Sequence, residues 1–303
     1  MMKTSIDHLP EKKQRELARI MELIHEEFDD AIADGTTEFK KKGRILKMIL
    51  FGSYARGDWV DEPHTMKGYR SDYDLLIVVN NRKLADFAYW YKAKDRLIRD
   101  QTVETPTNFI VHSRREVNTA LREGQYFFTD IRRDGIVLYE LDEEPLAEPR
   151  PLTPKEAYET AREHFENRFP GARNFHKLFA TALEGRMWKE AAFLLHQALE
   201  HGYATLLLVL TNYSPPSHKL SFLSALAEDQ DRRLAEVWPR DQQRYRAWFN
   251  TLNEAYVKAR YSKHYDISEE ALGWLGERTA ELQRLVEEIC RGHLRRLKEA
   301  VVG

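Results

Sequence analysis

Residues 49–79 read ILFGSYARGDWVDEPHTMKGYRSDYDLLIVV, in which two apolar runs enclose a Gly-Ser and an Asp-x-Asp. The runs RILKMILFGS and SDYDLLIVVN predict two strands. Side chains two positions apart in a strand point to the same face, so Asp72 and Asp74 should project side by side, with Tyr73 on the other face. Two carboxylates this close do not both ionise without a cation. That cation can be a lysine, an arginine or a metal ion.

Gly52 and Ser53, which precede this pair of aspartates, favour a site that binds a phosphate together with a metal ion. Gly52 lets backbone N–H groups approach a ligand closely, and a helix starting near Ser53 would direct its amino end at a phosphate. Mg²⁺ is the usual partner of oxygen ligands, and a phosphate facing a carboxylate pair suits nucleotidyl transfer by metal ions. The structural alternative is that Asp72 caps a turn and Asp74 pairs with Arg56 or Arg70. The joint pattern is more specific than either motif alone and favours the functional interpretation.

Strand and helix patterns alternate through the first half of the chain. Residues 9–34 place apolar side chains at three- and four-residue steps, which predicts a helix. Helical spacing recurs at 84–100 and 114–124, a short strand is predicted at 107–113, and residues 135–140 are expected to form a final strand or a turn. Strands interleaved with helices indicate an α/β or α+β domain.

A proline-rich segment separates this half from the second. Thr153, Pro154 and Glu156 predict a helix start, with a capping residue, a proline in the first turn and a capping box. Only helical patterns follow, including an apolar segment at 187–213 that we expect at the centre of a bundle. The sequence therefore predicts a domain over 1–143, a linker over 144–153 and an all-α bundle over 154–303.

The composition excludes several classes of protein. The 303 residues suffice for two domains, and 47 Lys and Arg against 49 Asp and Glu argue against a protein that coats nucleic acid by charge alone. A local basic patch is still compatible with this balance. The single cysteine, Cys290, rules out an intrachain disulfide and a paired-thiolate metal site. The start lacks the apolar core of a signal peptide and no apolar run reaches membrane-spanning length, so we expect a cytoplasmic protein.

The sequence FGSYARG followed by SDYDLLIVV resembles the minimal nucleotidyltransferases of the DNA polymerase β superfamily, which include antitoxin-type enzymes and kanamycin nucleotidyltransferase. The resemblance covers roughly residues 40–140. It implies an α+β fold with a mixed sheet, a nucleoside triphosphate substrate, most naturally ATP, and a site for two Mg²⁺ ions. The residues that it implies are Gly52, Ser53 and Arg56 for nucleotide binding, and Asp72 and Asp74 for metal binding and catalysis.

Two features depart from this family. The spacer between Ser53 and Asp72 is longer than usual, which makes residues 58–70 an insertion. A third carboxylate, often found on a later strand, has no clear counterpart: Asn108 stands where an acid would be expected, and Glu104 lies just before that strand. Without this third carboxylate, deprotonation of the acceptor hydroxyl would be weaker.

Three segments of the second half, EAAFLLHQALEHGYATLLLVL, PPSHKLSFLSAL and AYVKARYSKHYDIS, together resemble a HEPN domain over about residues 153–298. Many HEPN domains are metal-independent ribonucleases that use a closely spaced Arg and His. The resemblance therefore implies catalytic roles for Arg260 and His264, which are one residue closer than is usual. The alternative is that both residues cap a helix end. His196, on an apolar helix face, is expected to be a core histidine satisfied by a neighbour.

The sequence thus predicts a Mg²⁺-dependent transfer of AMP from ATP to an acceptor hydroxyl, within a toxin–antitoxin or defence-type module that includes the HEPN domain. The acceptor can be a protein tyrosine, an RNA or a small molecule. Tyr261 and Tyr265 are candidates because related antitoxin enzymes adenylylate a tyrosine beside this motif. Two alternatives remain open: a HEPN ribonuclease regulated by the first half, and an aminoglycoside-type antibiotic nucleotidyltransferase. The aromatic content of residues 188–256 predicts a homodimer through the helical half.

Overall fold

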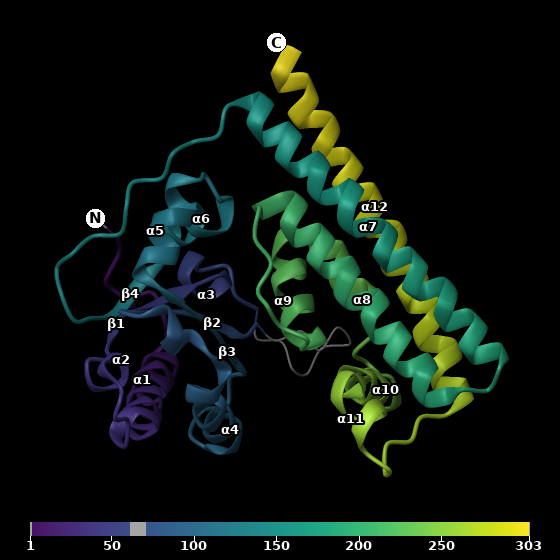
Figure 1. The fold of residues 1–303 in the computed structure, drawn as a ribbon, viewed down its shortest axis with the longest axis horizontal. Coiled ribbons are helices and arrows are strands. Elements are labelled where there is room, and N and C mark those ends of the chain that lie inside the picture. Colours follow the sequence, from purple (N-terminus) through teal and green to yellow (C-terminus); the bar gives the residue numbers. More distant parts are fainter. Residues whose placement is uncertain (1, 61–70, 303) are drawn as a thin grey trace. The chain divides into compact units, whose positions relative to one another are not determined.

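The computed structural model describes residues 2–60 and 71–302 (Figure 1). These residues fall into two compact units, one formed by residues 2–60 and 71–151 and the other by residues 152–302. The boundaries at 143 and 154 that the sequence suggests for the two domains stay a prediction, whereas the contrast between a mixed α/β half and a helical half is plain in the ribbon.

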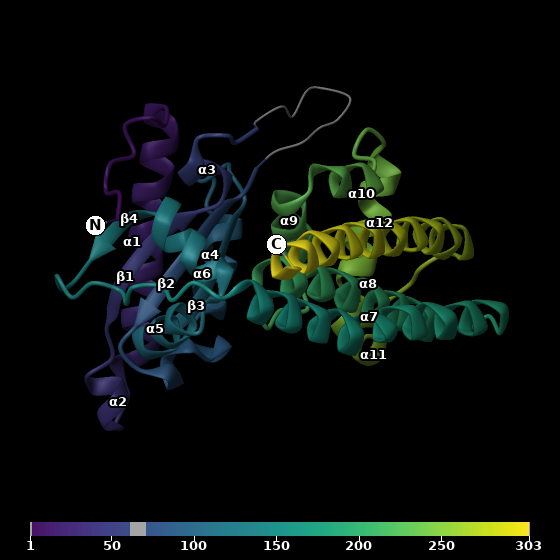
Figure 2. The ribbon, with the colours of Figure 1, turned by 90° about the horizontal axis from the view of Figure 1, so that it is seen from above.

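The first unit is built on a four-stranded sheet with the strand order β3-β2-β1-β4 (Figures 1 and 2). Strand β1 runs antiparallel to both β2 and β4, whereas β2 and β3 are parallel. This mixed sheet confirms the α+β expectation. The strands are β1 (Ile45–Phe51), β2 (Tyr73–Val79), β3 (Thr107–Ser113) and β4 (Ile136–Glu140).

The two faces of the sheet differ in what covers them. Helices α1 (Glu11–Ala33) and α4 (Tyr91–Arg99) share a hydrophobic core with the alternate residues Tyr73, Leu75 and Ile77 of β2. On the other face, α6 (Tyr126–Asp134) places Phe127 edge-to-face against Phe51, with 5.4 Å between the ring centroids. The remaining helices of this unit are α2 (Glu38–Lys41), α3 (Ser53–Arg56) and α5 (Arg114–Arg122).

Two details of this unit differ from the sequence-based expectation. The segment 84–100 is not one helix, because two short 3₁₀ turns, η1 (Arg82–Ala85) and η2 (Phe87–Tyr89), precede α4. The side chain of Asp86 accepts a hydrogen bond from the Ala88 N–H, a local bond that competes with continuous helix. Helix α6 was not anticipated, since its few apolar residues give only a short periodic signal.

The second unit is all helical and is organised around α8 (Trp188–Thr211). This helix packs against α7, α9, α11 and α12, which explains why its sequence is apolar nearly all round. The capping box at Thr153 and Glu156 is present at the start of α7. The helical segment 242–262 is divided at Glu254. The other elements are α7 (Pro154–Glu184), α9 (Leu220–Gln230), η3 (Arg232–Val237), α10 (Gln243–Asn253), α11 (Ala255–Tyr261) and α12 (Glu269–Val302).

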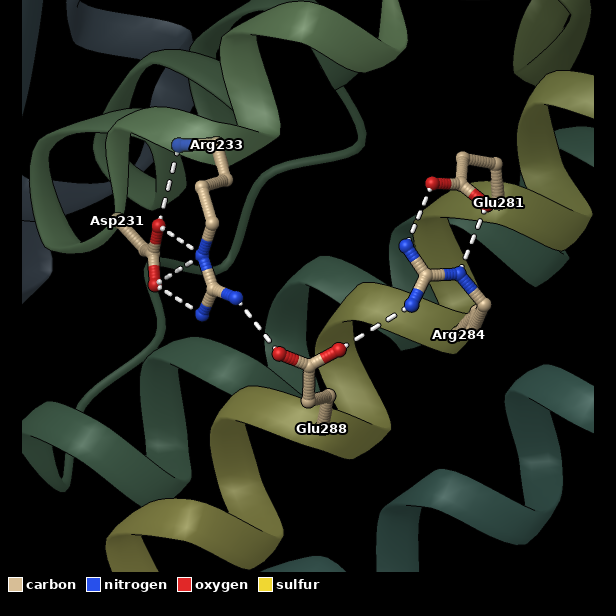
Figure 3. Close-up of polar contacts among 5 residues, drawn as sticks. All are labelled: Asp231, Arg233, Glu281, Arg284 and Glu288. Atoms are coloured by element: carbon tan, nitrogen blue, oxygen red, sulfur yellow. Dashed lines mark hydrogen bonds and ion pairs between the residues drawn. The ribbon is translucent and has the colours of Figure 1, made fainter.

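A chain of ion pairs on the surface connects η3 with α12 (Figure 3). Arg233 donates hydrogen bonds to both Asp231 and Glu288, while Arg284 donates to Glu281 and Glu288. The guanidinium groups lower the pKa of Glu281 and of Glu288 below the usual value. Because all of these side chains except Asp231 are well exposed, solvent screens the pairs and their contribution to stability is small. Among the helices that the structure describes, none is both long and apolar enough to cross a membrane.

Candidate functional site

The turn that follows β1 depends on glycine. Gly52 has φ 75° and ψ −154°, a combination that is essentially confined to glycine. The chain then makes the single helical turn α3, in which the N–H groups of Arg56 and Gly57 donate to the carbonyls of Gly52 and Ser53. The N–H groups at the start of a helical turn have no acceptor within it and can serve a ligand. Ser53, at the start of this turn, is itself buried.

The turn is fixed against the sheet by Tyr54. Its buried ring lies 4.4 Å from that of Tyr73 and 5.5 Å from that of Trp59, in near-parallel stacking with the latter. Nε2 of His8 donates to the Tyr54 carbonyl oxygen over 2.8 Å. The position of α3 at the end of β1 is therefore held by aromatic packing from several parts of the first unit.

Asp72, Asp74 and Asn108 meet at the mouth of β2. Asp74 is buried and lies opposite Phe51 across the β1–β2 pair, so it faces the α6 side of the sheet. Asn108 is its partner in the parallel β2–β3 register and donates from Nδ2 to Oδ2 of Asp72 over 2.8 Å. Tyr73 points to the opposite face, as expected for the residue between them. The two carboxylates thus lie beside the end of β1 and the Gly52 turn.

Behind the pair, on the α1 face, lies a buried polar network that the sequence reasoning missed. Oε2 of Glu16 accepts hydrogen bonds from the Tyr73 hydroxyl at 3.0 Å and from the Thr105 hydroxyl at 2.7 Å. Lys13 Nζ donates to the same Thr105 oxygen and lies 3.9 Å from Glu16. Lys13 and Glu16 are both almost fully buried. Helix α1 therefore holds Tyr73, the residue between the two aspartates.

The donor chemistry at this site fits Mg²⁺. In the part of the chain that the structure describes, no group of three His, Cys, Asp or Glu side chains is arranged to hold a metal ion. Mg²⁺, however, is commonly bound by one or two carboxylates together with substrate phosphates and water. Asp72 and Asp74 supply such a carboxylate pair. Asn108 occupies the register position beside Asp74, and Glu104 is engaged with Lys12 at 2.7 Å, so neither supplies a third acid here.

Helix α6 brings a further carboxyl group to this face of the sheet. Asp130 is half exposed and forms an ion pair with Arg133 at 2.9 Å; partial desolvation raises its pKa, and the positive charges of Arg133 and Arg56 oppose that rise. A carboxyl group with a raised pKa is suited to accept a proton. Arg56, at the end of α3, is exposed and forms an ion pair with Asp58 at 3.4 Å. Asp130 escaped the sequence reasoning because α6 itself was not predicted.

The insertion between α3 and β2 is described only at its two ends. The Ser71 N–H donates to the Val60 carbonyl at 2.8 Å, and the Val60 N–H donates to the Ser71 hydroxyl at 3.0 Å. These bonds bring the ends of the insertion together. Its residues 61–70, including Arg70, lie outside the described residues.

The structure does not join Arg260 and His264 in one site. Arg260 lies on α11, donates from Nε to the Tyr256 carbonyl at 2.7 Å and covers the Tyr256 ring at 4.3 Å. His264 is exposed in the turn after α11, where its backbone N–H donates to the Ser262 hydroxyl. No hydrogen bond, ion pair or ring contact links the two side chains across the described residues. Arg260 thus bonds a carbonyl of its own helix, whereas the alternative in which both residues cap the helix end stays a prediction.

A set of histidines lies around Tyr256. The His218 ring stacks on Tyr256 with 3.7 Å between centroids, and its Nδ1 lies 3.0 Å from Glu200. His196 is fully buried, and its Nε2 donates to the His218 carbonyl at 2.9 Å. This contact confirms that His196 is a core histidine satisfied by a neighbour.

His196 should make the second unit sensitive to acid. Burial lowers its pKa to about 4, from 6.5 for an ordinary histidine. Between these values the unfolded chain binds a proton that the folded chain does not, so stability falls as the pH drops. The expected loss is about 2 kcal/mol between pH 7.5 and pH 5.

His196→Gln keeps an N–H donor for the His218 carbonyl but cannot titrate. We therefore expect its urea midpoint to fall less than that of the wild type between pH 7.5 and pH 5. Burial also lowers the pKa of His176 and His201, and both are retained in the variant, so the difference isolates His196. Equal losses in the two proteins would contradict the expectation.

Comparisons with known proteins match both units. A family model described as "Nucleotidyltransferase domain" matches residues 35–127, and one described as "HEPN domain" matches residues 156–289. A Methanocaldococcus jannaschii protein named "Putative protein adenylyltransferase" is 37% identical over 100 residues, which cover 33% of this chain and 84% of the relative. Both resemblances inferred from the sequence are confirmed by these matches.

Proposed function

The chain belongs to the nucleotidyltransferase family and carries a HEPN domain after its transferase domain, and on this premise we propose that it transfers AMP from ATP to an acceptor hydroxyl with the help of Mg²⁺. As a member of this family it is a transferase that moves a nucleoside monophosphate. The choice of ATP, the metal and the acceptor are the proposed parts.

One observation carries the proposal: Asp72 and Asp74 share the mouth of β2 with the Gly52 turn at the end of β1. The turn, with Ser53 and Arg56, would hold the triphosphate through backbone N–H groups and a positive charge. Asp72 and Asp74 would hold Mg²⁺, which when bound neutralises phosphate charge and favours the departure of pyrophosphate.

The transfer itself makes one bond and breaks one. The acceptor oxygen forms a bond with the α-phosphorus, and the bond from that phosphorus to the oxygen bridging to the β-phosphorus breaks, releasing pyrophosphate. The acceptor hydroxyl gives up its proton, for which Asp130 of α6 is the candidate base, because its carboxylate is accessible and partial desolvation raises its pKa. In this role Asp130 would replace the third carboxylate that the family often carries on a later strand. Asn108 occupies that position here.

For the acceptor, we favour a protein tyrosine in a toxin–antitoxin type module. The two tyrosines beside Arg260 differ sharply in accessibility. Tyr261 is 75% exposed, whereas Tyr265 is buried and donates its hydroxyl to the Thr251 carbonyl at 3.2 Å. Burial also raises the pKa of Tyr265, which disfavours its phenolate. Tyr261 is therefore the better candidate, whether the transfer occurs within one chain or between two copies of the proposed homodimer.

The test is incubation of the purified protein with labelled ATP and Mg²⁺, with and without cell extract. Pyrophosphate release and an added AMP mass on a protein tyrosine would support the proposal. Tyr261→Phe should lose self-modification, whereas Tyr265→Phe serves as the matched control and should retain it. Label found only on an aminoglycoside would favour the antibiotic-modifying alternative. Absence of pyrophosphate release under all these conditions would overturn the transferase assignment for ATP.

The ribonuclease alternative has weaker geometrical support, because Arg260 is committed to Tyr256 and His264 is exposed elsewhere. Metal-independent cleavage of RNA that disappears in Arg260→Ala would nevertheless favour it.

Light scattering at micromolar concentration tests the homodimer.

A further inference from the structure

A groove between α7 and α12 has no role in the chemistry described above. Its volume is about 670 Å³, and its lining comes entirely from these two helices. The buried aromatic residues Phe165 and Phe169 lie at its base and stack on each other with 5.0 Å between centroids. Six cationic side chains line it: Arg162, Arg173 and Lys177 from α7, and Arg291, Arg295 and Lys298 from α12.

The positive charge of this groove is only partly neutralised. Glu166 is the one acidic residue in the described lining, 3.9 Å from Arg162. Glu287 is the shared partner of Arg173 and Arg291. Across the described residues, Lys177, Arg295 and Lys298 form no ion pair, although the whole chain has a net charge of −2. The groove is therefore a local basic surface on a nearly neutral protein.

Two of the four arginines of the groove lie over the aromatic rings at its base. The guanidinium carbon of Arg291 lies 5.3 Å from the Phe165 ring centroid, and that of Arg173 lies 4.9 Å from the Phe169 centroid. Side chains ordered before binding lose less conformational entropy when a ligand arrives. A guanidinium group can also pair with a phosphate through two hydrogen bonds and stack on a base.

From these features we propose that the α7–α12 groove binds single-stranded nucleic acid through its phosphate backbone. A single strand can lie along this groove with its phosphates between the cations of the two helices. Its unpaired bases can also reach the exposed guanidinium groups, which bases inside a duplex cannot do. Each helix carries its cationic side chains in a row, and the phosphates of a nucleic acid backbone are spaced along a strand in the same way. This site is independent of the transferase reaction and of Arg260.

Binding is measured by fluorescence anisotropy with a labelled oligouridylate and the full-length protein at near-physiological salt. The triple variant Lys177→Glu, Arg295→Glu and Lys298→Glu should bind at least about tenfold more weakly. Its salt dependence should also be shallower by roughly 2 in the slope of log K against log salt, since about 0.7 is lost for each phosphate contact removed.

Glu287→Gln gives a test in the opposite direction. It removes the carboxylate shared by Arg173 and Arg291, so the affinity should rise severalfold. The matched control reverses three equally exposed cations of the same unit, Lys219, Arg246 and Lys263, and should leave affinity within about twofold because none lines the groove. Both the gain and the loss are expected to be unaffected by Asp72→Asn.

Several results would overturn the proposal. These are no binding at micromolar protein, equal loss in the control triple variant, equally tight binding of a duplex, or full competition by polyglutamate at equal charge concentration. The last result would identify the groove as a site for acidic polypeptides. Circular dichroism of each variant ensures that a loss of affinity is not a loss of fold, and the Glu287→Gln gain cannot arise from unfolding.

Discussion

Replacing either Asp72 or Asp74 by asparagine is expected to reduce nucleotidyl transfer by roughly 10³-fold, the order seen when a group that stabilises transition-state charge is removed. Asparagine keeps the shape of the side chain but removes the negative charge that would hold Mg²⁺. The fold should persist, because the neutral variant relieves repulsion between two neighbouring carboxylates. The melting temperature without metal should therefore be unchanged or slightly higher.

The measurement is Mg²⁺-dependent release of pyrophosphate from ATP, with thermal melts on the same samples. Asp95→Asn is a matched control, since Asp95 is an exposed carboxylate on α4 that pairs with Arg99 at 3.0 Å. It should retain full activity. A double variant, Asp72→Asn with Asp74→Asn, that transfers AMP at the wild-type rate would remove the metal-site assignment.

The local geometry of this site could be predicted because it depends on neighbours in sequence. Side chains alternate between the two faces of β2, so Asp72 and Asp74 point away from the face that holds Tyr73. The backbone conformation of the turn after β1 requires the glycine at position 52. Asn108 is also predictable as the replacement of an acid, because the short strand that contains it follows in the expected order. Each of these inferences required only a strand pattern and a short motif.

The rest depended on contacts between distant segments. Lys13 and Glu16 lie within an apolar helix pattern, and nothing in that pattern shows that Tyr73 and Thr105 come to meet them. Asp130 could not be proposed without α6. In the second unit, the sequence spacing of Arg260 and His264 suggested a shared site, whereas the end of α11 after Tyr261 separates them. Helical spacing predicts neighbours only while the helix continues.

The second large effect is expected from Glu16, which should be essential for the stability of the first unit. Glu16→Gln should lower the free energy of unfolding by about 3–5 kcal/mol, the usual cost of breaking a buried ion pair from one side. The lost charge faces the buried Lys13 ammonium at 3.9 Å. Urea denaturation measures the loss. Glu22→Gln, an exposed glutamate on the same helix that pairs with Arg19 at 3.2 Å, is the control and should cost less than about 1 kcal/mol.

The same network should affect catalysis through Tyr73. Burial, with the negative charge of Glu16, raises the Tyr73 pKa, so its hydroxyl stays protonated and donates to Glu16. Tyr73→Phe removes this bond together with the hydroxyl's 3.3 Å hydrogen bond to the Lys13 carbonyl, and should cost about 1 kcal/mol in stability. Loosening the residue between Asp72 and Asp74 should lower kcat about tenfold with little change in KM, because misplaced catalytic groups weaken stabilisation of the transition state more than they weaken substrate binding.

A double-mutant cycle of Glu16→Gln and Tyr73→Phe should give coupled effects on kcat. Additive effects, or a Glu16→Gln variant as stable as Glu22→Gln, would show that α1 does not position the aspartates.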